Sequence, residues 1–198
     1  MRYATAMRWM WLVVLGGCGP VMSSGADAGP GPLSVTTIDA GCAVRIEAWP
    51  LGAGIHVDIG SEIAWPSNPP QSGTHYPAWA AFQEFSTPVP RGYYVHDLEH
   101  GAVVLLHHCA LAGVDCTPTL EALRRAVASL PDDPRCSAGV RVRTVITPDP
   151  LITEPIVAVS WGFVYRAQCV DLPSLQDFMR SHYAHAPEDE CANGVTRF

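Results

Sequence analysis

Apolar residues run almost without interruption through two stretches of this chain. Residues 101–107 read GAVVLLH and residues 156–167 read IVAVSWGFVYRA. Runs of this kind predict strands that are buried on both faces of a sheet. Three other segments predict shorter strands, the last two with alternating apolar and polar positions: residues 45–47, 55–59 and 140–146.

Two amphipathic segments predict helices. Thr117 offers a hydroxyl cap and Pro118 suits a first turn, so the first helix begins here and ends before Pro131. The second helix opens at Asp171 and Pro173. The apolar faces consist of Leu120, Leu123, Val127 and Leu130 in the first helix, and of Leu175, Phe178, Met179 and Tyr183 in the second.

Prolines recur throughout residues 66–90, which excludes a long helix or a central strand there. We expect this segment to be ordered and to cover an edge or one face of the sheet. The sequence therefore predicts a single α+β domain. Its mixed or antiparallel sheet carries two packed helices and a long Pro-rich wrapping segment.

The N-terminus has the layout of an export signal. Residues 1–17 carry two arginines, a short apolar run and then small residues, and the run is too short to span a bilayer. The sequence LGGC that ends at Cys18 resembles a bacterial lipobox, which predicts lipidation of Cys18. The alternative is an ordinary signal peptide with an unrelated cysteine. We therefore expect a flexible tether over 18–40, a folded domain over 41–198, and a location on the outside of a bacterial membrane.

The charge pattern excludes several classes of function. The net charge is −7 and the chain contains no lysine. It therefore lacks the basic surface of a nucleic-acid-binding protein, and it cannot form a Schiff base or supply a P-loop lysine. The membrane, through the lipid anchor, is the only partner that the sequence indicates.

Six cysteines follow Cys18, and an even number in an exported chain predicts disulfides: Cys42, Cys109, Cys116, Cys136, Cys169 and Cys191. No C-x-x-C spacing is present, which argues against a thioredoxin-like site or a zinc ribbon. Cys109 and Cys116 are close enough to clip one loop. Cys169 and Cys191 flank the last predicted helix and form a second candidate pair, leaving Cys42 and Cys136.

Three motifs resemble those of domain-of-unknown-function family 3105. Residues 68–77 match its NPP-x-SG-x-HYP segment and residues 96–101 match its H-x-LEHG segment. Residues 160–162 read SWG, where the family has AWG before a closing helix. The resemblance extends from about Ile55 to Glu188. The family name implies no activity, so function has to come from the residues themselves.

Histidines are concentrated in these motifs. His96, Glu99 and His100 form the H-x-x-E-H pattern, in which two imidazoles four residues apart share a helix face and could bind one metal. Gly101 follows at once as a C-terminal cap, so the sequence predicts little more than one helical turn here, too little for a zincin peptidase. His75 lies in a turn that Gly73 and the flanking prolines make rigid.

We expect His75, His96 and His100 to converge, and the resemblance adds His56 because the family has a histidine at a comparable place. Imidazoles suit Cu(II) or Zn(II), so the first hypothesis is a transition-metal site, copper or zinc, with Glu99 orienting one ligand. Two alternatives stay open. One is a metal-dependent hydrolase with Glu99 as base, and the other is a binding or scaffold module whose histidines only hold the fold together.

Overall fold

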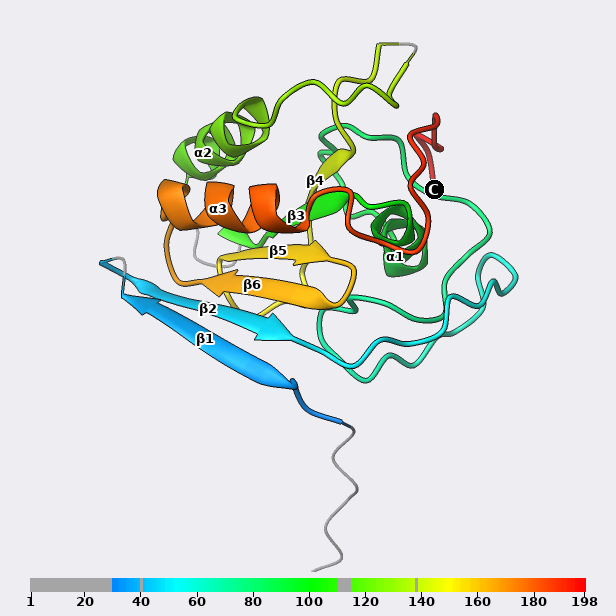
Figure 1. Ribbon diagram of the computed structural model, residues 1–198, viewed down its shortest axis with the longest axis horizontal. Helices are drawn as coiled ribbons and strands as arrows, with labels where there is room; N and C mark the ends of the chain where they lie inside the picture. The colour runs from blue at the N-terminus through cyan, green and yellow to red at the C-terminus, as the bar shows by residue number, and fades with distance from the viewer. Residues whose placement is uncertain (1–29, 40, 110–114, 138) are drawn as a thin grey trace, which may run out of the picture.

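The computed structural model describes residues 30–39, 41–109, 115–137 and 139–198, and it shows a six-stranded mixed sheet with three helices (Figure 1). The strands are β1 Ser34–Asp39, β2 Ala43–Ala48, β3 Val103–His107, β4 Thr144–Pro148, β5 Ile156–Ser160 and β6 Phe163–Ala167. The helices are α1 Arg91–Glu99, α2 Thr117–Ala128 and α3 Leu172–His182. The strand order is β1-β2-β6-β5-β3-β4, with only β3 and β4 parallel among these neighbours. The α+β class expected from the sequence is confirmed.

Of the predictions for the N-terminus, only the tether overlaps residues that the structure describes. The signal peptide at 1–17 and Cys18 lie outside the described residues. Residues 18–40 were expected to form a tether, but β1 occupies Ser34–Asp39 and pairs antiparallel with β2 at the edge of the sheet. In the part of the chain that the structure describes, no helix is long and apolar enough to cross a membrane.

The interior strand β3 separates two hydrophobic cores. Its alternate residues point to opposite faces, so Val103 and Leu105 pack with α2 and α3, whereas Val104 and Leu106 pack with α1. All five residues of β3 are buried, as the continuous apolar run predicted. The two helices expected from the amphipathic pattern, α2 and α3, therefore cover one face of the sheet, and α1 packs on the other.

Three predicted elements differ from the structure. Residues 156–167 form a hairpin, β5 and β6, instead of one strand, because Gly162 takes a φ of +85° and turns the chain back. Residues 55–59 form no strand; only His56 makes an isolated bridge, with His75. The strand expected at 140–146 begins later, at Thr144, and four of its five residues are buried.

Three disulfides are present, and only one of the expected pairings is confirmed. Cys109 bonds to Cys116, but Cys42 bonds to Cys169 and Cys136 bonds to Cys191. The pairing of Cys169 with Cys191 was wrong because β2 lies beside β6, which brings Cys42 to Cys169 at the ends of these two strands. Three disulfides indicate an oxidising, extracytoplasmic environment.

Candidate metal centre

The turn that carries His75 is fixed from several directions. Gly73 takes a φ of +99°, the positive value that its place before the histidine predicted. The Ser72 hydroxyl accepts a hydrogen bond from the Gly52 N–H at 2.9 Å. Backbone bonds of 3.0 and 2.9 Å then join His75 to Ile55 and Val57, on either side of His56. The bridge therefore holds the two histidines side by side.

Helix α1 supplies the opposite wall, and it is longer than the sequence suggested. It spans Arg91–Glu99, nine residues, and every residue after Arg91 is buried. Gly92 is required where α1 meets the turn, because a Cβ at this position would lie 2.6 Å from the Tyr76 ring. The C-terminal end of α1 presents His96 and Glu99, three residues apart, to the same side of the helix.

His56, His75, His96 and Glu99 come together and are named the inner group. Each offers one ligand atom, and these atoms all lie within 4.8 Å of one another, so the group could hold a metal ion. The ring centroids of the three histidines are 4.7–4.8 Å apart. His56 is exposed, whereas the other three residues are buried.

Backbone carbonyls fix the tautomer of two of these imidazoles. His75 Nδ1 lies 2.7 Å from Gly73 O, and His96 Nδ1 lies 2.7 Å from Tyr76 O. A carbonyl oxygen only accepts, so both Nδ1 atoms carry a proton, and Nε2 is the ring nitrogen that can bind a metal in each imidazole. A hydrogen bond from the second ring nitrogen to a backbone carbonyl is the usual support of a metal-bound histidine.

The Glu99 carboxylate is placed as a ligand of a shared cation would be. Its Oε2 lies 3.0 Å from His75 Nε2, but this nitrogen has no hydrogen bond of acceptable direction within the described residues. A carboxylate repels the Nε2 lone pair of a neutral imidazole, and a proton or a metal ion bound between the two atoms removes the repulsion. Two atoms bound to one ion at about 2.0–2.1 Å lie about 2.9–3.4 Å apart, which matches the observed spacing.

The carboxylate reaches this place because Gly54 lacks a side chain. A Cβ on Gly54 would lie only 1.8 Å from Glu99 Oε1. Glu99 was expected to orient an imidazole from behind. The structure instead groups it with the imidazoles.

Burial keeps His96 in its metal-binding form. The pKa of His96 is lowered to about 4, mainly by burial and also by the neighbouring His100, His75 and His56, while the hydrogen bond to Tyr76 O opposes the shift. His96 is therefore neutral at neutral pH, with its Nε2 lone pair free to bind a metal.

His100, which the sequence placed with the other three histidines, belongs to a neighbouring set. Ligand atoms of His96, His100 and Glu188 also lie within 4.8 Å of one another, and we name this set the outer group. Burial lowers the pKa of His100, while Glu190, Glu188 and Glu99 oppose the shift. Glu188 was missed because it lies in an acidic stretch far along the chain, which by itself indicates only a solvated surface.

A third set of His107, Cys109 and Cys116 has ligand spacing as well. Its two sulfurs are joined in a disulfide, so they cannot bind a metal in this form. Met179 is fully buried in the core between the sheet and α3, on the other face from α1. A thioether is therefore absent from the inner group.

Comparison with known proteins yields a family but no characterised relative. No curated protein and no solved structure matches the chain. A family model described as "Protein of unknown function (DUF3105)" matches residues 56–194, a range that begins at His56 and contains both groups of candidate ligands. The chain therefore belongs to domain-of-unknown-function family 3105.

Proposed function

We propose that this protein binds a transition-metal ion, copper or zinc, through His56, His75, His96 and Glu99. The observation that carries the proposal is the convergence of three imidazoles, two of which have their Nδ1–H committed to backbone carbonyls. Three nitrogens and one oxygen form a donor set that suits Cu(II) or Zn(II). A Cu(I) site built on sulfur has no support in the inner group.

The two alternatives from the sequence are less well supported. A hydrolase needs Glu99 as a free base, whereas its carboxylate lies among the candidate ligands. A purely structural role accounts for the Nδ1 hydrogen bonds of His75 and His96. It gives no reason for the buried Nε2 of His75 to lie 3.0 Å from a carboxylate while forming no hydrogen bond with any residue that the structure describes.

The test is metal binding by variants of single ligands. Protein purified without added metal should contain close to one equivalent of copper or zinc. His75→Ala and His96→Ala should each lower the affinity for Cu(II) or Zn(II) by at least about 100-fold, since even residues behind the ligands contribute about 10–100-fold. Competition titration against a chelator measures the affinity.

His185→Ala is the matched control, because His185 also bonds a backbone carbonyl, Ser181 O at 2.9 Å, but is exposed and stands apart from both groups. The His185→Ala variant should bind Cu(II) or Zn(II) with the affinity of the wild type. Substoichiometric metal in the wild type, together with unchanged affinity in both ligand variants, would refute the metal proposal.

We further propose that Cys18 is lipidated and anchors the domain to the outside of a membrane. The charged leader and the sequence LGGC support this, and the three disulfides agree with an extracytoplasmic location. Cys18→Ser should move the protein from the membrane fraction to the soluble fraction. A wild-type protein that is already soluble would contradict the anchor.

A further inference from the structure

The segment after α3 crosses the C-terminal end of α1. The Ala184 N–H donates to Gly101 O over 2.8 Å, and the Glu188 N–H donates to Glu99 O over 3.0 Å. These bonds bring the Glu188 carboxylate to His100, whose Nε2 lies 3.2 Å from Glu188 Oε2. An imidazole–carboxylate pair of the outer group therefore stands beside the inner group.

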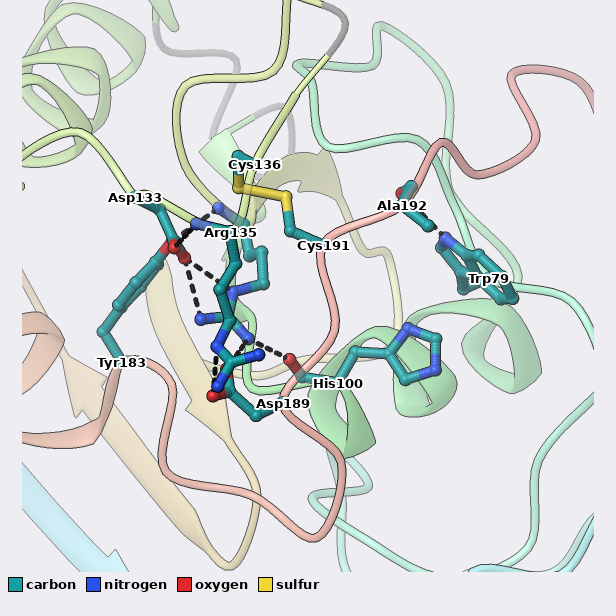
Figure 2. Close-up of a disulfide and its surroundings, with 10 residues drawn as sticks. Trp79, His100, Asp133, Arg135, Cys136, Tyr183, Asp189, Cys191 and Ala192 are labelled. Carbon is teal, nitrogen blue, oxygen red and sulfur yellow. Dashed lines mark hydrogen bonds and ion pairs between the residues drawn. A yellow bond between two sulfur atoms is a disulfide. The ribbon is translucent and has the colours of Figure 1, made fainter.

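This segment is held firmly, as Figure 2 shows. Cys191 forms a disulfide with Cys136, and Asp189 forms ion pairs with Arg143 at 2.8 Å and with Arg135 at 2.6 Å. Arg143 is 1% exposed, so one of these pairs is anchored in the interior. The backbone next to Glu188 is consequently fixed, although the Glu188 side chain itself is 52% exposed.

The two groups share His96, and this residue can serve only one ion at a time. Its Nδ1–H is donated to Tyr76 O, so a single nitrogen, Nε2, remains for a metal. The inner and outer groups therefore describe two alternative positions of one ion. An ion that moved from one group to the other would exchange its other ligands while His96 stayed bound.

The outer position is the weaker of the two. His100 is 1% exposed, yet its Nδ1 finds no hydrogen-bond partner in the described part of the chain, so it lacks the carbonyl support that His75 and His96 have at Nδ1. Imidazoles without such support are poorer ligands. The Glu188 side chain is also half exposed, whereas that of Glu99 is 9% exposed, so more side-chain freedom is lost when Glu188 binds.

We propose that His100 and Glu188 form a loading position, in which a Cu(II) or Zn(II) ion is first held with His96 before it moves to the inner group. The proposal rests on metal binding by the inner group. It adds that the protein takes up and releases its ion in two steps and is built for exchange. The competing route is direct access at His56, which is exposed.

The test measures the rates of Cu(II) binding and release in full-length protein by stopped-flow quenching of tryptophan fluorescence. The Trp79 ring lies 5.1 Å from the His96 ring and 4.6 Å from the His100 ring, close enough for a bound Cu(II) to quench it. A loading position lowers the free-energy barrier between free and bound metal, and therefore speeds binding and release by the same factor. Glu188→Gln should therefore slow binding and release each by about tenfold, with the dissociation constant changed less than about twofold.

Glu190→Gln is the matched control, since Glu190 also acts electrostatically on His100 but is not in the outer group. It removes the same charge, and its rates should stay within about twofold of the wild type. If Glu188→Gln binds and releases Cu(II) at the wild-type rates, or is slowed no more than Glu190→Gln, the loading position is overturned and direct entry at His56 remains. Faster release with unchanged binding, or two ions per wild-type chain, would overturn it as well. A wild type that binds no Cu(II) or Zn(II) would refute the metal proposal itself.

Discussion

At the residue scale, a hydrogen bond from an imidazole to the backbone is not enough to identify a ligand. His108 and His185 donate Nδ1–H to Ile152 O and Ser181 O in the same way as His75 does to Gly73 O. Among the described residues, neither His108 nor His185 belongs to a group of candidate ligand atoms. What distinguishes His75 and His96 is that their remaining nitrogens converge with those of other residues.

His182 shows a different use of a histidine. It lies at the C-terminal end of α3, and its ring packs on Phe163 and Phe178, with centroid distances of 4.1 and 4.6 Å. The pKa of His182 is lowered to about 4, mainly by burial and to a smaller extent by His185. Protonation therefore favours the unfolded chain, whose histidine has the ordinary pKa of about 6.5.

This difference predicts a loss of stability in acid. The contribution of neutral His182 is fully present above about pH 6.5 and is lost as the pH falls toward 4. His182→Phe keeps the aromatic contacts and cannot be protonated. The fall in the free energy of unfolding between pH 7 and pH 4.5 should be smaller in this variant by about 1–2 kcal/mol, a figure reduced for partial exposure.

Urea denaturation at the two pH values measures this fall. His185→Gln, which removes only the smaller cause of the shift, should change it less. An identical fall in the wild type and in His182→Phe would show that His182 does not contribute.

At the element scale, the sequence predicted those elements whose two sides differ. The helices α2 and α3 each have an apolar face, and α3 begins where Asp171 was expected to begin it: its carboxylate accepts the Ser174 N–H at 3.0 Å. The helix α1 is buried almost all round, so it has no polar face and no amphipathic period to detect. The hairpin of β5 and β6 was hidden for a related reason, because apolar Trp161 precedes Gly162 in its turn.

The candidate site was predictable in part, and the limit is physical. Motif spacing identified His75 and His96, and the family resemblance added His56. Motif spacing could not show that His100 belongs to a different group of ligands from His96, because residues i and i+4 share a helix face whatever lies opposite each of them. Glu188 approaches His100 only through the path of the C-terminal segment over α1, which depends on tertiary contacts.

A buried arginine of β6 explains how the NPP motif is positioned. Arg166 of β6 pairs with Glu47 and Glu154, each at 3.1 Å, and donates to Asn68 O at 2.6 Å. This ties the segment that leads to His75 directly to the sheet. Arginine is mostly exposed in proteins, so this role of Arg166 could not be predicted from the sequence.

At the scale of the whole molecule, the sheet separates the hydrophobic core under α2 and α3 from the candidate metal ligands. The core under α2 and α3 includes the buried Met179 and holds no member of either ligand group, whereas the inner group rises from α1 and the turns on the other face. The C-terminal segment crosses from the α3 side to α1 and joins the two (Figure 1). Changes in the first core should therefore alter stability before they alter metal affinity.

The three disulfides close loops of very different length, so they should stabilise the molecule unequally. The sequence separations are 127 residues for Cys42–Cys169, 55 for Cys136–Cys191 and 7 for Cys109–Cys116. In the chain-entropy account, such loops correspond to about 5, 4 and 2–3 kcal/mol, because a long loop restricts the unfolded chain more. Paired Cys→Ser variants should lower the free energy of unfolding in this order, as measured by urea denaturation at neutral pH. A larger loss on removing Cys109–Cys116 than on removing Cys42–Cys169 would show that local strain or contacts outweigh loop closure here.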